Sequence, residues 1–207
     1  AEDDFKLTAD LLEEAITDKT KVVIIPFPNN PTGAIMTREE LEPIVNLLKD
    51  KEVIILSDEI YSELTYGTEH VSIASFPEVK EKTIVINGFS KAYAMTGWRL
   101  GYACGHPIFI DAMKKIHQYA IMCSPTTAQF AAIEALKNGD EEVSKMCKEY
   151  NRRRRVMVNG FRELGLECFE PMGALYVFPS IKSTGMTSDE FCEKLLMEEK
   201  FLCVPGN

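Results

Sequence analysis

Three apolar segments of the sequence are each followed by polar side chains that can do chemistry. Asn30 lies beyond residues 22–25, Asp58 follows residues 53–57, and Lys91 follows residues 83–87 after a short turn. Carboxyl ends of parallel strands meet at one edge of a sheet, where ligands gather. An amide, a carboxylate and an amine are therefore expected to converge on one crevice. An amine there can attack a carbonyl carbon or carry a proton.

The helices and strands that must position these residues are predicted from the sequence pattern. Short apolar runs alternate with segments in which apolar residues recur at helical spacing. Such alternation predicts an α/β fold with a mostly parallel sheet covered by helices in three layers. Thr37 and Glu40 form a capping box, and Pro107 suits a first helical turn. Strands are expected at 21–26, 53–57, 83–87 and 98–104, and helices at 9–16, 37–49, 107–120 and 125–137.

The last third of the sequence has a different pattern. One long helix is expected over 140–164, ending before Gly165, a residue that suits a helix C-cap. Beyond it, strands are expected at 173–178 and 201–204 around a helix at 188–199. This outline indicates a smaller α+β unit and a domain boundary near residue 145.

Composition and charge exclude several classes of function. The 207 residues include 23 basic and 32 acidic side chains, a formal net charge of −9 that disfavours nucleic acid or an anionic membrane as partner. No apolar run is long enough for a membrane span. The six cysteines are scattered and no secretory segment precedes them, so we expect reduced thiols in a cytoplasmic protein. His and Cys residues lack metal-ligand spacing, and no metal site is predicted.

Four motifs carry a resemblance to a known family. They are 30–33 (Asn-Pro-Thr-Gly), 57–61 (Ser-Asp-Glu-Ile-Tyr), 90–91 (Ser-Lys) with Arg99 eight residues later in 95–102, and 173–176 (Gly-Ala-Leu-Tyr). In this order and at these spacings the chain resembles the class I/II aminotransferases, pyridoxal-phosphate (PLP) enzymes of fold type I. Within them it is most similar to the branch of the bacterial aspartate and N-acetyl-diaminopimelate aminotransferases.

The resemblance implies a role for each candidate residue. Lys91 would hold PLP as a Schiff base and move a proton between substrate and cofactor. Asp58 would keep the pyridine nitrogen protonated, and Asn30 and Tyr61 would hydrogen-bond the phenolic oxygen. Arg99 would clamp the phosphate. The implied reaction moves an amino group between an aspartate-like or related amino acid and a 2-oxo acid.

One position departs from the family pattern. Many relatives have a small hydroxyl residue three positions before the lysine that also binds the phosphate, but Gly88 stands there in this sequence. Ser90, adjacent to Lys91, is retained as a cofactor-binding candidate whose part in phosphate binding stays open.

Each candidate residue also has a structural interpretation. Asp58 can cap a helix beginning near Glu59, and Tyr61 can simply pack. Asn30 can serve turn chemistry, and Arg99 can pair with a structural carboxylate.

The resemblance also implies how much of the protein is present. Residues 1–145 match the C-terminal portion of a PLP-binding large domain and 146–207 part of the small domain, so we expect a fragment that is itself inactive and a longer protein that is a homodimer. Two alternatives stay open: a PLP-dependent C–S lyase acting at the β or γ carbon, and a non-catalytic, aminotransferase-like effector domain.

Overall fold

Four strands form one sheet whose order follows the chain, β1-β2-β3-β4, in a computed structural model that describes residues 4–206. β1 pairs with β2 and β2 with β3 in parallel, whereas β4 runs antiparallel to β3. This arrangement confirms the predicted α/β class with a mostly parallel sheet. The strands are β1 (Val22–Ile25), β2 (Ile54–Asp58), β3 (Thr83–Gly88) and β4 (Gly101–Cys104).

Seven α-helices and three short 3₁₀ turns connect and follow the strands within residues 4–206. None of these helices has both the length and the apolar character needed to cross a membrane. The helices are α1 (Ala9–Ala15), α2 (Arg38–Leu48), α3 (Pro77–Lys80), α4 (Pro107–Ala120), α5 (Thr126–Asn138), α6 (Asp140–Glu163) and α7 (Ser188–Glu199). The 3₁₀ turns are η1 (Ile73–Ser75), η2 (Thr96–Trp98) and η3 (Lys182–Thr184).

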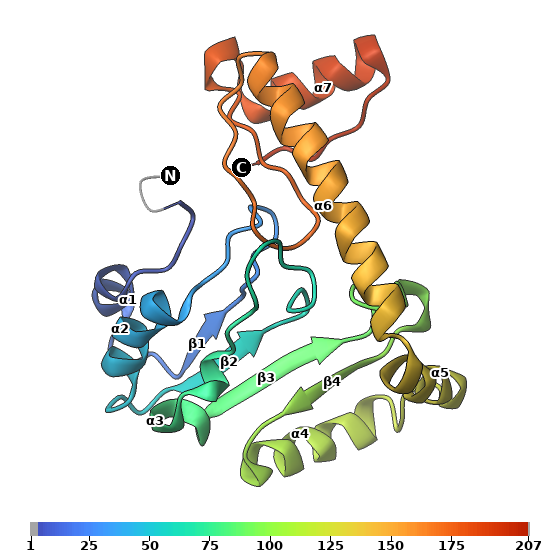
Figure 1. Cartoon of the computed structure of the whole chain (residues 1–207). Coiled ribbons are helices and arrows are strands. Elements are labelled where there is room, and N and C mark those ends of the chain that lie inside the picture. The colour runs from blue at the N-terminus through green and yellow to red at the C-terminus, as the bar shows by residue number, and fades with distance from the viewer. Residues whose placement is uncertain (1–3, 207) are drawn as a thin grey trace.

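The main core lies between the sheet and α1, α2 and α3, which gather beside β1 and β2 (Figure 1). α2 begins at the predicted capping box, in which the Thr37 side chain accepts from the Glu40 N–H and the Glu40 carboxylate accepts from the Thr37 N–H. Its inner face buries Ile44 and Leu48 completely against Ile55 of β2. Each such burial contributes about 1.5–3 kcal/mol, which anchors the strands that lead to the candidate residues.

The opposite face of the sheet is less covered. Side chains of β1 alternate between buried and exposed, and Val22 and Ile24 point to solvent. α4 buries none of its side chains fully, and α5 buries only Ala128 and Ala132. Apolar surface therefore remains open on this side of the molecule.

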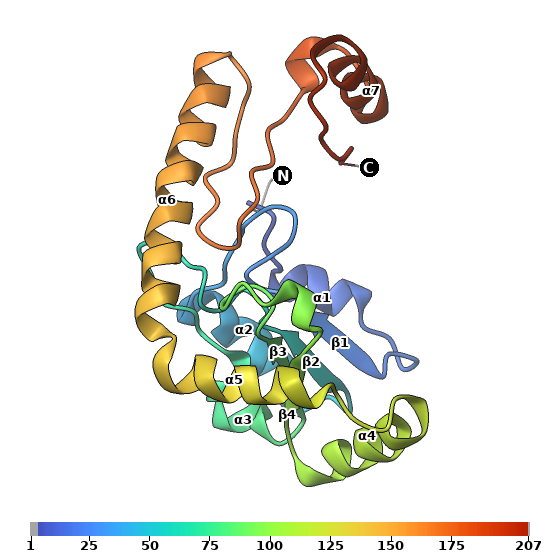
Figure 2. The ribbon, with the colours of Figure 1, turned by 90° about the vertical axis from the view of Figure 1, so that its right-hand side faces the viewer.

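α6 rises from the sheet toward α7 and is the longest helix of the described chain (Figures 1 and 2). Arg154, near its middle, donates from Nη1 to Glu170 Oε1 at 2.6 Å and to the Pro171 carbonyl at 3.0 Å. Arg162 Nη1 lies 2.9 Å from Glu170 Oε2. These contacts hold the segment around Glu170 and Pro171, which follows α6, against the helix. Gly165 follows the helix end with φ +79°, as the sequence predicted.

The strand predicted at 98–104 is shorter than expected. Residues 96–98 form η2, and Arg99 then adopts left-handed geometry with φ +53°. A left-handed residue interrupts extended backbone, so pairing begins only at Gly101.

The strands predicted at 173–178 and 201–204 are wrong for the described residues. Within the first segment only Gly173 makes an isolated bridge, to Thr65. The N–H groups of Met172 and Gly173 donate to the Gly33 carbonyl, and that of Ala174 to Leu64. These donors are thus used by loops near the strand ends instead of by a neighbouring strand. Residues 201–206 contain no regular element. The helix predicted at 188–199 is confirmed as α7.

Candidate active site

The turn after β1 separates the roles of two adjacent asparagines. Asn29 makes the turn: its Oδ1 accepts from the Thr32 hydroxyl at 2.8 Å and the Thr32 N–H at 3.4 Å. Asn30 is exposed and hydrogen-bonds Tyr61. The Phe27-Pro28 and Asn30-Pro31 peptide bonds are both cis. The turn chemistry considered for Asn30 therefore belongs to Asn29, which leaves the Asn30 side chain for contact with Tyr61.

Asp58 is the last residue of β2 and half-buried. Its Oδ1 accepts from the Ile60 N–H at 3.2 Å, which stabilises the turn that carries the chain on to Tyr61. No α-helix begins there. The carboxylate thus stabilises a local turn, a role similar to the helix capping considered for it. Its negative charge also raises the pKa of the Tyr61 phenol.

Tyr61 is the residue on which the predicted site converges. Its hydroxyl lies 2.6 Å from the Tyr176 hydroxyl, and the two rings meet edge to face with centroids 5.7 Å apart. Asn30 hydrogen-bonds the same phenol. Lys91 Nζ lies over the Tyr61 ring, 5.7 Å from its centroid. Three predicted residues from three separate strand ends therefore act on the buried Tyr61 side chain: Asn30 and Lys91 through contacts, and Asp58 through its charge.

The environment keeps the Tyr61 phenol protonated. Burial raises its pKa above the ordinary value of 10, and the hydrogen bond and charge of Tyr176 and the charge of Asp58 raise it further. The hydrogen bond with Asn30 lowers the pKa but does not cancel these effects. Tyr61 is consequently a neutral O–H donor at physiological pH.

Ser90, Lys91 and Arg99 belong to one loop between β3 and β4. Thr96 ties its ends together: its hydroxyl donates to the Ser90 carbonyl at 2.9 Å, and its own carbonyl accepts from Arg99 Nη1 at 2.8 Å. Arg99 is exposed, and its recorded hydrogen bond lies within this loop. The structure therefore links Ser90 and Arg99 through Thr96 but records no contact between Arg99 and the Tyr61 cluster.

A second buried network lies directly behind Asp58 and was not predicted from the sequence. Glu59 is 5% exposed, and its Oε1 accepts from the hydroxyls of Ser57 at 2.9 Å and Ser72 at 2.6 Å. His70 Nε2 lies 3.0 Å from Glu59 Oε2, an ion-pair distance without hydrogen-bond alignment. Burial alone would raise the Glu59 pKa, but the contacts with His70, Ser72 and Ser57 lower it below its ordinary value.

Two features of the sequence could have identified some of the residues that the sequence analysis did not assign to the site. Ser57 and Glu59 are two apart at a strand end, a spacing that places both on the face opposite Asp58. Tyr176 lies in the Gly-Ala-Leu-Tyr motif that supported the resemblance, without a role of its own. No signal identified Ser72, His70 or Thr96.

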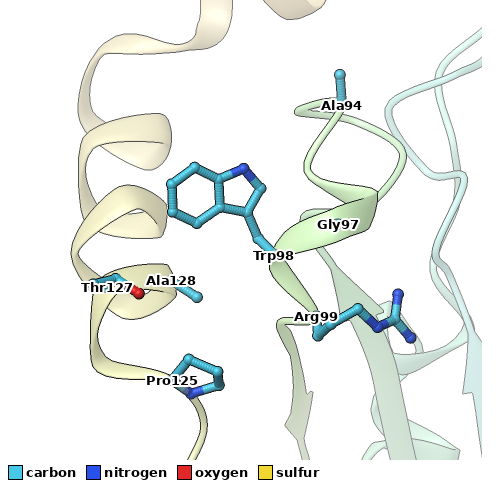
Figure 3. Close-up of a pocket in the computed structure, with 7 residues that line it drawn as sticks. All are labelled: Ala94, Gly97, Trp98, Arg99, Pro125, Thr127 and Ala128. Carbon is cyan, nitrogen blue, oxygen red and sulfur yellow. The ribbon is translucent and has the colours of Figure 1, made fainter.

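A cavity of about 380 Å³ lies beside the Lys91–Arg99 loop (Figure 3). Trp98 projects from that loop toward the start of α5, whereas the Arg99 guanidinium points away from Trp98. Asn30, Asp58, Tyr61 and Lys91 do not line this cavity. The candidate site is therefore defined by the contacts around Tyr61 and not by this cavity.

The polar groups around Tyr61 suit an organic ligand. One amine, one carboxylate, one amide and phenolic hydroxyls can contact a carbonyl carbon, a cationic ring nitrogen and an anionic oxygen. Among residues 4–206 no three His, Cys, Asp or Glu side chains are grouped so as to hold a metal ion.

Comparison with known proteins gives consistent results over the whole chain. The family model described as "Aminotransferase class I and II" matches residues 1–207. The Bacillus subtilis (strain 168) protein YugH, whose name places it among aminotransferases, is 56% identical over all of this chain and 54% of its own length. A second protein of that organism, named for N-acetyl-LL-diaminopimelate aminotransferase, is 45% identical over 98% of this chain and 51% of its length.

A solved structure agrees with the sequence comparisons. The crystal structure of the aromatic aminotransferase from Pyrococcus horikoshii OT3 superposes with a TM-score of 0.96 at 43% identity, covering 100% of this chain and 56% of that one. The chain spans about half the length of the curated relatives it matches. The predicted resemblance, down to its branch, is confirmed.

Proposed function

This chain belongs to the aminotransferase class I and II family, and from that premise we propose that the cluster around Tyr61 is the cofactor end of a PLP-dependent transaminase site. PLP supplies an aldehyde for covalent attachment and an electron-withdrawing ring that stabilises negative charge on the substrate carbon. The proposed reaction passes an amino group from an amino acid, aspartate-like or related, to a 2-oxo acid. The observation that carries the proposal is the position of Lys91 Nζ over the ring of Tyr61, 5.7 Å from its centroid.

The residues present fit this cofactor. Lys91 offers the single amine of the cluster, and its Nζ lies 5.7 Å from the centroid of the Tyr61 ring. Asp58 offers the carboxylate, and its charge acts on the same phenol. The Tyr61 phenol is neutral, so its O–H is a donor suited to an anionic oxygen, and the Asn30 amide is a second donor.

Each residue then has one task. Lys91 Nζ binds the aldehyde carbon and, when displaced by an incoming amine, carries a proton to or from the substrate carbon. Asp58 holds a proton at the ring nitrogen by stabilising its positive charge. Tyr61 and Asn30 donate to the phenolic oxygen. Arg99 binds the phosphate, since its flat guanidinium suits a bidentate contact, whereas the part of Ser90 in phosphate binding stays open.

The remainder of the proposed assignment concerns the longer protein. We propose that residues 1–145 form the C-terminal portion of its PLP-binding large domain and 146–207 part of a small domain entered through α6. The proposed assembly is a homodimer in the cytoplasm. The six unbonded cysteines support a reducing compartment.

Borohydride trapping tests the cofactor assignment. The chain is incubated with PLP, reduced with borohydride and analysed by intact mass and peptide mapping. We expect one phosphopyridoxyl group on Lys91 and its loss in Lys91→Ala. Lys115→Ala, which removes an exposed lysine of α4, is the matched control and should label like the native chain. Labelling of equal extent in Lys91→Ala would contradict the assignment.

The reaction type is tested separately, by product analysis. Transamination yields a 2-oxo acid only in step with amination of an acceptor. Pyruvate and ammonia formed without an acceptor would instead indicate the lyase alternative. PLP bound at Lys91 without either product in the full-length protein would favour the effector-domain alternative.

A further inference from the structure

Residues 201–206 return along α7 after the chain reverses at its end. Lys200 caps α7 in left-handed geometry, and its N–H donates to the carbonyls of Leu195 and Leu196. At the other end of the segment the Gly206 N–H donates to the Ser188 hydroxyl at 2.7 Å, in the first turn of the same helix. The segment is thus held to α7 at both ends without belonging to any sheet.

Two cysteines face each other between these attachments. Cys203 Sγ donates to Cys192 Sγ across 3.3 Å, and both side chains are half-buried. A disulfide requires about 2.05 Å between sulfurs, so closure needs a shift of roughly 1.3 Å, which small side-chain rotations supply. Burial, the hydrogen bond and charge of Cys203, and the charge of Asp189 together raise the pKa of Cys192 to about 11. Cys192 is therefore a poor nucleophile at neutral pH.

We propose that Cys192 and Cys203 form a thiol–disulfide pair that low-molecular-weight disulfides oxidise, so that residues 201–206 become covalently fastened to α7. The pair lies on α7 and the returning segment, outside the residues assigned to the cofactor, and its chemistry does not depend on Lys91.

The exchange proceeds in two balanced steps. The Cys203 thiolate attacks one sulfur of the disulfide RSSR, forms a mixed disulfide and releases RS⁻, which takes up the proton lost by Cys203. The Cys192 thiolate then attacks the Cys203 sulfur and releases a second RS⁻, which takes up the proton lost by Cys192. The two cysteines together lose two electrons, and RSSR is reduced to two RSH. Once Cys203 is part of the mixed disulfide, its charge no longer opposes ionisation of Cys192 in the second step.

Peptide mapping after exchange with oxidised glutathione tests the pair. The native 207-residue chain is equilibrated with oxidised and reduced glutathione, quenched with iodoacetamide and digested with trypsin. Cleavage at Lys194 and Lys200 separates the two cysteines, so the disulfide appears as peptides 183–194 and 201–207 joined with the loss of two hydrogens. We expect this linkage to exceed that of the same chain in urea by at least about tenfold, because the fold holds the thiols together.

Single variants separate pairing from general reactivity. Cys192→Ser and Cys203→Ser should each abolish the linkage and leave glutathione on the remaining cysteine, whereas Cys123→Ser, at an exposed position, should leave the linkage intact. Far-UV circular dichroism identifies any variant that does not fold. In the native chain, glutathione on Cys192 or Cys203 without linkage, reaction only at Cys104 and Cys123, or equal linkage in urea would each overturn the proposal.

Discussion

Asp58 and Glu59 are adjacent carboxylates with opposite environments. Asp58 is half-buried beside Tyr61, and Glu59 is enclosed by Ser57, Ser72 and His70 on the other face of the strand end. A fixed Glu59 holds the backbone from which Asp58 and Tyr61 both project. Because a displacement of that backbone would move both candidate residues, we expect Glu59 to help position them.

Removal of the Glu59 charge should reveal a pH-dependent contribution to stability. The folded pKa of Glu59 lies below its ordinary value of 4.5, so the folded state binds fewer protons than the unfolded state near that pH. The stabilisation is complete above the unfolded pKa and is lost as pH falls through the lower folded pKa. We expect Glu59→Gln to lose about 1–3 kcal/mol of unfolding free energy at pH 7, and the difference from native to narrow below about pH 4.5.

Urea unfolding between pH 7 and pH 4 measures this difference. Glu69→Gln, at an exposed neighbouring position, removes the same charge and should change stability little. A difference between native chain and Glu59→Gln that stays constant down to pH 4 would exclude a depressed pKa for Glu59.

The Tyr61–Tyr176 contact should show energetic coupling. Removing either hydroxyl breaks the 2.6 Å hydrogen bond, so Tyr61→Phe and Tyr176→Phe should each destabilise the fold, and the double variant less than their sum. The expected coupling energy is about 0.5–1.5 kcal/mol. Urea unfolding of the four proteins measures it, with Tyr119→Phe, at a 95% exposed side chain, as control. Additive losses would mean that the two hydroxyls act independently.

Sequence reasoning named candidate residues for the site but not the contacts between them. Asn30, Asp58, Tyr61 and Lys91 were identified because each follows an apolar run or lies in a motif. Tyr176 contacts Tyr61 across 115 positions of sequence, and no local pattern encodes such a pairing. The same holds for the contact of His70 with Glu59. Arg99 stays a prediction, since its recorded hydrogen bond is to Thr96.

Secondary structure elements were predicted well where local signals were strong. The Thr37 capping box begins α2, Pro107 begins α4, and Gly165 follows α6, as expected. The predicted strand at 173–178 failed for a physical reason. An apolar run can pair only if a strand edge is within reach, and the N–H groups at 172–174 instead bond to Gly33 and Leu64.

The Lys82 side chain caps the C-terminus of α2, where the helix sequence itself provides no capping glycine. Its ammonium donates to the carbonyls of Leu48, Lys49 and Lys51 at 2.6, 2.9 and 2.7 Å. Carbonyls at a helix C-terminus have no partner within the helix. Lys82→Met should therefore destabilise the fold by about 1.5–3 kcal/mol and speed amide exchange at 46–51.

Exchange measured by mass spectrometry, together with urea unfolding, checks this result. Lys80→Met provides the matched control, because Lys80 is exposed at the end of α3. Equal stability of the two variants would show that solvent satisfies the three carbonyls as well as Lys82 does.

The molecule as a whole leaves much apolar surface in water. On α4, Ile116 and Tyr119 are 71% and 95% exposed, and Phe130 of α5 is 69% exposed. Exposed apolar patches of this kind promote association. The net charge of −9 opposes it through mutual repulsion. Salt screens that repulsion beyond about 10 Å at 0.1 M ionic strength, so the extent of self-association should depend on salt concentration.

The chain should accordingly self-associate as salt rises. Light scattering should show an average mass that increases with salt and protein concentration, and Ile116→Ser combined with Tyr119→Ser should reduce the increase. Gln118→Ser, at an exposed polar position of the same helix, should not. A mass independent of both salt and concentration would show that this surface is not adhesive.

The strand order has a consequence for how the protein is made. Val22 pairs with Ile54, Ile55 with Thr83, and Val85 with Cys104. Each of β2, β3 and β4 therefore joins a strand that was synthesised about 20–30 residues earlier, which is seconds earlier at typical elongation rates. Loop closure and hairpin formation take microseconds or less. The sheet can therefore grow in the direction of synthesis, because the strand with which each new strand pairs has already been synthesised.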